Sequence, residues 1–142
     1  MTATVIITDE GFGKDDWTGD YATPDAARPA DPAGTALDLP PDTRLEALPD
    51  WALGAGLIRI RFPSFSDGRG FTLARQLRLA GYRGRLRAFG HLLPDQYAMA
   101  RRAGFDEVEI DRTLADRLTE EQWRARANWR AHDHQARLRR FA

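Results

Sequence analysis

The chain has 142 residues, of which 42% are hydrophobic, and this is enough for one domain with a packed core. It contains no cysteine, which excludes disulfides, thiolate nucleophiles, cysteine zinc sites and iron–sulfur ligation by its own side chains. The formal net charge of +0 conceals an uneven distribution of charge along the chain.

Acidic and basic residues are concentrated in different parts of the sequence. Residues 1–50 carry eleven acidic residues against three basic ones, and residues 51–142 carry eighteen arginines against ten acidic residues. Arginine binds planar oxyanions in bidentate fashion, so the second part of the chain can form an anion-binding surface. The alternative is that a GC-rich genome encodes arginine in place of lysine and that the acidic part lies against the basic part.

The N-terminal third shows few regular elements. The sequence MTATVIITDEGFG has no basic region and no long apolar stretch, so we expect no signal peptide, no membrane association and a cytoplasmic protein. Residues 5–8 are a β-branched run that predicts a strand. Residues 9–41 are rich in Asp, Gly, Pro and Ala, which predicts a largely irregular or mobile segment within a single domain spanning 1–142.

Strands and helices are expected to alternate after a short helical turn at Leu45 and Leu48. The run LIRIRF, residues 57–62, predicts a largely buried strand whose two arginines point to the other face or past the sheet edge. Helices are expected over 71–81 and 94–103, and strands over 83–90 and 105–110. The capping box at 119–122 predicts a helix over about 120–140.

This order of elements predicts the fold class. It indicates an α/β protein with a small open, mainly parallel sheet, a βαβαβ core and a long C-terminal helix. The chain is too short for a complete (β/α) barrel.

Three segments of this fold are expected to meet where the parallel strands end, because ligands in open α/β sheets bind beyond the carboxyl ends of the strands. These segments are residues 63–70, 90–96 and 111–113. Their candidate anion- or ligand-binding residues are Ser64, Ser66, Asp67, Gly68, Arg69, Gly70, His91, Asp95, Gln96 and Arg112.

Two interpretations of the loop FPSFSDGRG, residues 62–70, are open. Its glycines can take positive φ and let backbone amides and Arg69 approach an anion. Alternatively, Ser66 or Asp67 caps the following helix and the glycines only turn the chain. The loop matches neither the dinucleotide-binding G-x-G-x-x-G pattern nor the P-loop, whose lysine is absent.

His91 and the C-terminal segment add two further hypotheses. His91 can act as a general acid or base oriented by Asp95 or Asp111, or can be an ordinary hydrogen-bonding residue. The predicted terminal helix carries Trp123 and Trp129 among arginines, which suits docking on the domain's own sheet or on another subunit. Nucleic-acid binding is disfavoured because no recognised binding motif accompanies this helix.

The blocks FPSFSDGRGFTLARQLR, GYRGRLRAFG, LLPDQ and RRAGFD occur in this order within residues 62–106. They resemble a bacterial family of unknown function whose members are described as a probable oxidoreductase subunit, encoded beside assimilatory sulfite or nitrite reductase. The chain departs from the family pattern at His91 and Leu92, and at Ala103, where members often carry cysteine.

The resemblance implies an accessory, non-catalytic role in sulfite or nitrite reduction, with a reductase subunit as partner. It does not identify a cofactor, and any redox chemistry must be accessory or must use a diffusible cofactor. The competing hypothesis is a small enzyme or sensor that binds an anionic metabolite or nucleotide at the three-loop edge.

Overall fold

A computed structural model describes residues 4–129 of the chain. Within these residues the fold is built on a seven-stranded sheet in the order β2-β1-β7-β6-β5-β4-β3. The strands are β1 (Thr4–Thr8), β2 (Gly11–Gly13), β3 (Asp20–Ala22), β4 (Thr35–Leu39), β5 (Leu57–Phe62), β6 (Arg85–Gly90) and β7 (Glu107–Asp111). The helices are α1 (Arg69–Leu79), α2 (Tyr97–Ala103), α3 (Arg112–Arg117) and α4 (Glu120–Arg124), with short 3-10 turns at Pro32–Gly34, Leu45–Ala47, Ala52–Gly54 and Pro94–Gln96.

The predicted α/β class is confirmed. Strands β3 to β7 pair in parallel in chain order, whereas β1 is antiparallel to both β2 and β7. The βαβαβ core consists of β5, α1, β6, α2 and β7, as the sequence predicts. In the described part of the chain, no helix combines the length and the apolar character needed to cross a bilayer.

Two parts of the structure differ from the sequence-based expectation. The segment 9–41 contains the strands β2, β3 and β4, and Ala36, Leu37 and Leu39 of β4 are completely buried. The helix expected over about 120–140 begins as predicted at Glu120, but α4 ends at Arg124 and turns follow. The rest of that expected helix, from residue 130, lies outside the described residues.

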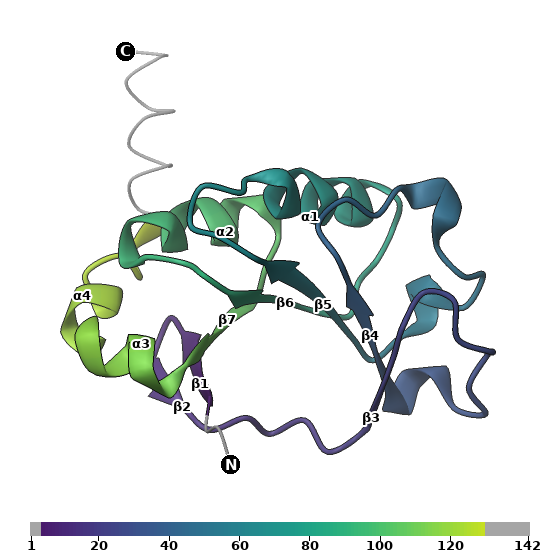
Figure 1. The fold of residues 1–142 in the computed structure, drawn as a ribbon, viewed down its shortest axis with the longest axis horizontal. Helices are drawn as coiled ribbons and strands as arrows, with labels where there is room; N and C mark the ends of the chain where they lie inside the picture. The colour runs from purple at the N-terminus through teal and green to yellow at the C-terminus, as the bar shows by residue number, and fades with distance from the viewer. Residues whose placement is uncertain (1–3, 130–142) are drawn as a thin grey trace.

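Helices α1 and α2 cover one face of the sheet (Figure 1). The side chains on this face are apolar. The β-strand alternation points Ile58, Ile60 and Phe62 of β5 to this side, where they join the same hydrophobic cluster as Leu73 and Leu77 of α1. The core therefore lies between the strands and these two helices, which fixes the strand ends in position.

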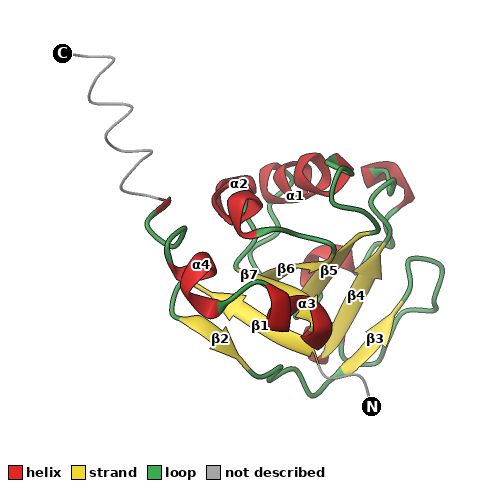
Figure 2. Cartoon of the chain, turned by 60° about the vertical axis from the view of Figure 1, so that its left-hand side comes forward, coloured by secondary structure: helices red, strands yellow, loops and turns green. Residues whose placement is uncertain are grey.

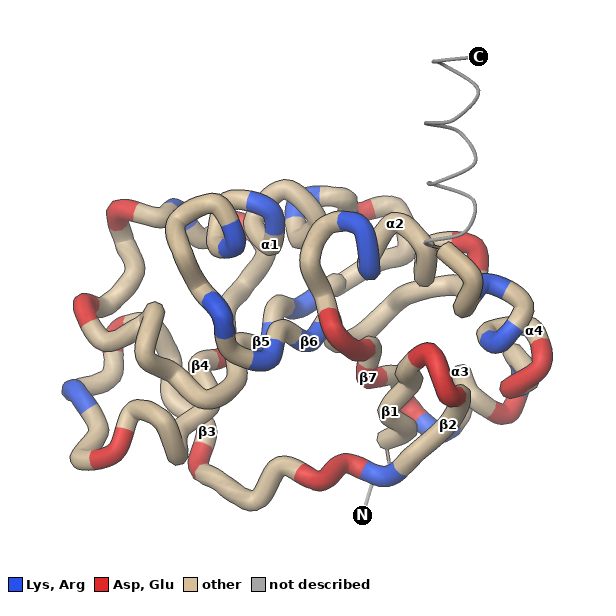
Figure 3. Tube along the Cα trace, turned by 180° about the vertical axis from the view of Figure 1, so that it is seen from behind, with Lys and Arg blue, Asp and Glu red and all other residues tan. Residues whose placement is uncertain are grey.

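The opposite face of the central strands is charged. Arg87 on β6 is fully buried and donates hydrogen bonds to Glu107 (2.6 Å) and Glu109 (3.0 Å) on β7. Arg59 on β5 bridges Glu109 and Asp38, each at 3.2 Å. Figure 3 shows basic positions along β5 and β6. Because buried charges are tolerated only when paired, this network accounts for the arginines that alternate with apolar residues in the strands.

The N-terminal segment between β2 and β3 completes this charged face. It passes on the side of the sheet away from α1 and α2, as Figures 1 and 2 show. Its Asp15 pairs with Arg87 at 3.1 Å, and Asp16 pairs with Arg85 at 2.8 Å. Burial opposes the charge of Arg87, but the hydrogen bond with Asp15 and the charge of Glu107 outweigh it and raise the pKa of Arg87. The acidic N-terminal part thus lies against the arginines of the sheet.

The turn between β1 and β2 contacts α2 and the segment after α4. Asp9 accepts hydrogen bonds from the Tyr97 hydroxyl and from Arg101 on α2, and the Trp129 indole lies 3.4 Å from it. Trp123 is buried and packs edge-on against Tyr97, with ring centroids 6.3 Å apart. These contacts connect the two ends of the described chain.

Candidate functional site

An open cavity of about 710 Å³ lies at the carboxyl ends of β5, β6 and β7, and we call it the carboxyl-edge cavity. The parallel pairing of these strands brings their exit segments together at one edge of the sheet, as the sequence predicts. The cavity is lined by Thr4, Arg61, Phe62, Pro63, Phe65, Phe89, Gly90, His91, Asp111, Thr113, Leu114 and Arg117.

One wall of the cavity is formed by Arg61 and Phe89, which lie opposite each other in the register of β5 and β6. The Arg61 guanidinium is 5.4 Å from the centroid of the Phe89 ring, within cation–π range. Arg61 donates a hydrogen bond of 2.8 Å to Asp38, yet its side chain remains 52% exposed. Asp38 also binds Arg59, so one carboxylate is shared between two arginines.

A second wall is formed by Phe65 and His91. Their rings meet edge to face, with centroids 5.1 Å apart. The Nδ1 atom of His91 lies 3.3 Å from the carbonyl oxygen of Phe62. When Nδ1 carries the proton, it donates to this carbonyl, and Nε2 keeps its lone pair for a ligand.

The rim contributed by α3 adds a second arginine. Arg117 is exposed, and its side chain forms no hydrogen bond or ion pair with residues 4–129. Asp111, at the end of β7, is the acidic residue of the lining. The cavity lining therefore combines two exposed arginines and a histidine with several aromatic rings. The one carboxylate in the lining is that of Asp111, at the end of β7.

The loop after β5 contributes to this cavity only through Pro63 and Phe65. Ser64 and Ser66 lie 3.3 Å apart and interact with each other through their hydroxyl groups. Asp67 binds the Arg69 side chain through both carboxylate oxygens, at 2.9 and 2.7 Å, and also accepts a hydrogen bond from the Arg69 backbone amide. These three contacts hold the first turn of α1.

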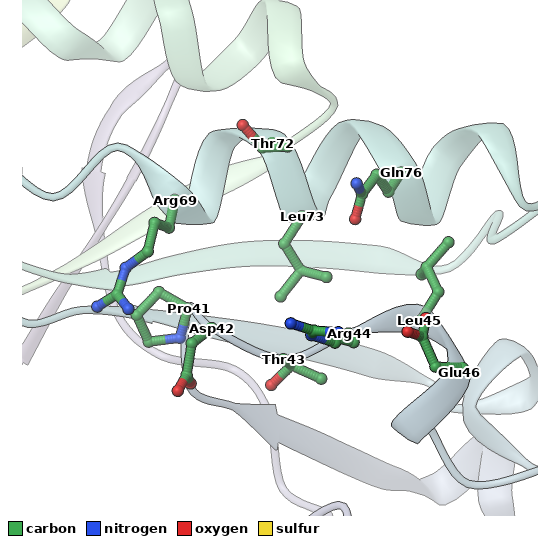
Figure 4. A pocket seen from close by; sticks show the side chains of 10 residues that line it. All are labelled: Pro41, Asp42, Thr43, Arg44, Leu45, Glu46, Arg69, Thr72, Leu73 and Gln76. Atoms are coloured by element: carbon green, nitrogen blue, oxygen red, sulfur yellow. The ribbon is translucent and has the colours of Figure 1, made fainter.

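Arg69 lines a different cavity, of about 480 Å³, between α1 and the loop after β4 (Figure 4). In this second cavity it lies with Arg44, Asp42 and Glu46, among other residues of the two segments. Because Arg69 and His91 line separate cavities, the structure divides the predicted cluster of candidate residues into two groups.

Neither glycine of the loop, Gly68 or Gly70, has the expected positive φ. In the described residues, positive φ occurs at Gly11, Gly81, Gly90 and Gly104, and at neither Gly68 nor Gly70. The expectation of positive φ in this loop is therefore wrong. Gly70 is required by packing instead, because a Cβ there would lie 2.5 Å from the Phe62 ring.

The remaining predicted residues, Asp95, Gln96 and Arg112, do not line the cavity. Gln96 donates to the carbonyl of Phe65 and so fixes one cavity-lining residue. Asp95 accepts a hydrogen bond of 2.6 Å from Arg126 instead of orienting His91. Arg112 is exposed and lies beside the cavity-lining Asp111 without lining the cavity itself.

Sequence reasoning missed Arg61, Phe89, Phe65 and Arg117 as residues of this cavity. Arg61 and Phe89 are the last side chains of β5 and β6 that point to the charged face, and their register was not deducible before the strands were paired. In the part of the chain that the structure describes, no group of three or more His, Asp or Glu side chains could hold a metal ion.

Comparison with known proteins identifies the family. The sequence model of one protein family, described as bacterial protein of unknown function (DUF934), matches residues 36–140. The chain belongs to this family. The match includes β5 to β7, all of β4 except Thr35, and every residue of the cavity lining except Thr4. No curated protein and no solved structure matches the chain.

Proposed function

We propose that this protein binds an anionic ligand in the carboxyl-edge cavity and serves as a non-catalytic accessory protein of assimilatory sulfite or nitrite reduction. The observation that carries the binding proposal is the pair Arg61 and Arg117, two exposed cations around one cavity. Bidentate guanidinium groups suit the planar geometry of carboxylates and the oxygens of sulfur and phosphorus oxyanions.

The link to a reductase is supported by the resemblance of residues 62–106 to a family described as a probable oxidoreductase subunit. The chain has no cysteine, so thiolate ligands for an iron–sulfur cluster would come from the partner enzyme. Because the partner enzyme would hold the cluster, we prefer an accessory function to independent redox catalysis by this chain.

A thermal-shift screen tests the binding proposal. Sulfate, sulfite, phosphate, nucleotides and flavins are each titrated against the full chain, since a ligand of the folded state raises the melting temperature by mass action. We expect at least one of these anions to raise it in a saturable manner. A flat response to all of them up to the millimolar range would contradict the proposal.

Co-purification tests the accessory role. An affinity-tagged chain is expected to retain a sulfite or nitrite reductase from cells grown on sulfate or nitrate, and to show no turnover alone. Recovery of the tagged protein as an unattached monomer under these conditions would count against the role, whatever the outcome of the ligand screen.

A second candidate function is a small enzyme or sensor that acts on an anionic metabolite or nucleotide. It is favoured by His91, whose Nδ1 lies near the Phe62 carbonyl and whose ring belongs to the cavity wall. A histidine held in this way can exchange a proton with a ligand through Nε2. In this case His91→Gln would preserve ligand binding but abolish turnover, whereas in the accessory role there is no turnover to lose.

A further inference from the structure

We infer that the ligand of the carboxyl-edge cavity joins a planar aromatic ring to an anionic group. This inference rests on the proposed function, because it specifies the class of anion that the same cavity takes. It is carried by the size of the cavity, by the two partly exposed phenylalanines and by the position of Arg61 beside one of them.

The cavity is much larger than an inorganic anion needs. Its volume of about 710 Å³ falls in the range of roughly 300–1,000 Å³ that is typical of sites for complete organic ligands. A sulfate or phosphate bound to Arg61 would leave most of the cavity wall uncovered, including the rings of Phe65 and Phe89.

The two phenylalanines provide surfaces for a ring. Phe65 is 38% exposed and does not belong to the hydrophobic core. Phe89 is partly exposed, and the Arg59 guanidinium lies 4.3 Å from its centroid, so an ion-paired cation already stacks on this ring. A planar ring of a ligand that covers Phe65 or Phe89 is favourable, because it removes apolar area of these side chains from water and allows the rings to stack.

The charges fix where the anionic group belongs. Arg61 and Phe89 face each other across β5 and β6, so a cation and a ring occur side by side in the same wall. Asp111 is at the end of β7, two strands away from Arg61, which corresponds to roughly 10 Å in a sheet. A ligand that places its ring against Phe89 and its anion at Arg61 contacts both groups and keeps the anion away from Asp111. Asp38 remains shared between Arg61 and Arg59.

The test compares ligands that differ in the ring or in the charge. AMP and FMN carry a ring and a phosphate, ribose 5-phosphate and inorganic phosphate carry only the anion, and adenosine carries only the ring. Calorimetry on the full chain is expected to show that AMP or FMN binds at least tenfold more tightly than ribose 5-phosphate and than adenosine. Ribose 5-phosphate binding as tightly as both ring-bearing anions would overturn the inference.

Two variants locate the effect in the cavity. Phe89→Leu is expected to weaken binding of the better of AMP and FMN at least fivefold, and to weaken binding of inorganic phosphate by a clearly smaller factor. Phe65→Leu provides a second measurement, since this exposed ring lies outside the core and the variant is expected to fold. Unchanged binding of that ligand to both folded variants would contradict the inference.

The failure of this inference and that of the proposed function give different results. If inorganic phosphate and ribose 5-phosphate bind, and the ring adds nothing, only the ring requirement is wrong. If none of the five ligands and no sulfur oxyanion binds, the proposed anion site itself is wrong.

Discussion

Gly70 packs directly against the ring of Phe62. A Cβ at position 70 would lie 2.5 Å from Cζ and 2.7 Å from Cε1 of that ring. The ring cannot move aside freely, because Phe62 is 1% exposed and its centroid lies 4.9 Å from that of Phe71. The second glycine of FPSFSDGRG therefore allows α1 to approach the end of β5, and a ligand is not needed to explain it.

The first prediction uses this contact. Gly70→Ala is expected to lower the free energy of unfolding by about 1–3 kcal/mol, the usual cost of overpacking. Without the contact, the same change inside a helix would stabilise the protein by roughly 0.5–1 kcal/mol. The sign of the change in the free energy of unfolding therefore shows whether the contact with Phe62 is present. Gly68→Ala is the control, because the atom nearest to its added Cβ would be 3.9 Å away. Its free energy of unfolding is expected to change by less than about 1 kcal/mol. Urea unfolding of the three proteins measures both effects.

The second prediction concerns the buried charge network. Arg87→Met is expected to destabilise the protein by about 3–5 kcal/mol, because it leaves the carboxylates of Glu107 and Glu109 buried with fewer partners. Arg83→Met is the matched control, since Arg83 is exposed and a change within about 0.5 kcal/mol is expected there. Equal unfolding midpoints for the two variants would show that the network does not stabilise the sheet.

The third prediction is a pH dependence at Asp9. Burial favours the neutral form of this carboxyl, but the hydrogen bonds from Tyr97 and Arg101 and the charge of Arg101 prevail and lower the pKa of Asp9. A carboxyl with a lowered pKa in the folded state stabilises the fold above its unfolded pKa of about 3.9, and this stabilisation disappears as the pH falls through the folded pKa.

Asp9→Asn is therefore expected to cost about 1–2 kcal/mol at neutral pH, a value reduced by the partial exposure of the carboxylate. The difference in the free energy of unfolding between Asp9→Asn and the unmodified protein should become steadily smaller as the pH is lowered below 4. Asp116→Asn, at an exposed position of α3, is expected to show neither effect. A difference for Asp9→Asn that stays constant from pH 7 to pH 3 would contradict the assigned ion pair.

Regular periodicity allowed much of the fold to be predicted from the sequence. The strand over 57–62 and the helices expected over 71–81 and 94–103 follow from alternating or helical apolar spacing and from their glycine and proline boundaries. The structure has these helices at Arg69–Leu79 and Tyr97–Ala103. Strand β4 was missed because its five residues follow a proline-rich segment, and only pairing with β5 reveals the buried Leu37 and Leu39.

The candidate residues predicted from the sequence do not share one cavity in the structure, and only His91 among them lines the carboxyl-edge cavity. Chain order is sufficient to bring the ends of β5, β6 and β7 together, and His91 lies in the cavity as expected. Which side chains face that cavity depends on strand register and local pairing. Arg69 is bound by Asp67, two residues away, whereas Arg61 is aligned with Phe89, 28 positions away in the sequence.

The binding of an anion by Arg61 tests the account most directly. Calorimetric titration of sulfate, sulfite and phosphate compares the unmodified chain with Arg61→Gln and Arg69→Gln. Both variants lose one exposed arginine from the same edge of the sheet, but Arg61 lines the carboxyl-edge cavity and Arg69 lines the other one. Asp38 keeps its contact with Arg59 after the first change, so the fold is expected to persist.

We predict that Arg61→Gln weakens the tightest of these anions by about 1.5–3 kcal/mol, which is roughly tenfold or more, and that Arg69→Gln leaves its affinity unchanged. The opposite result, with affinity lost on Arg69→Gln and retained on Arg61→Gln, would assign the anion to the cavity beside α1 and would contradict the account.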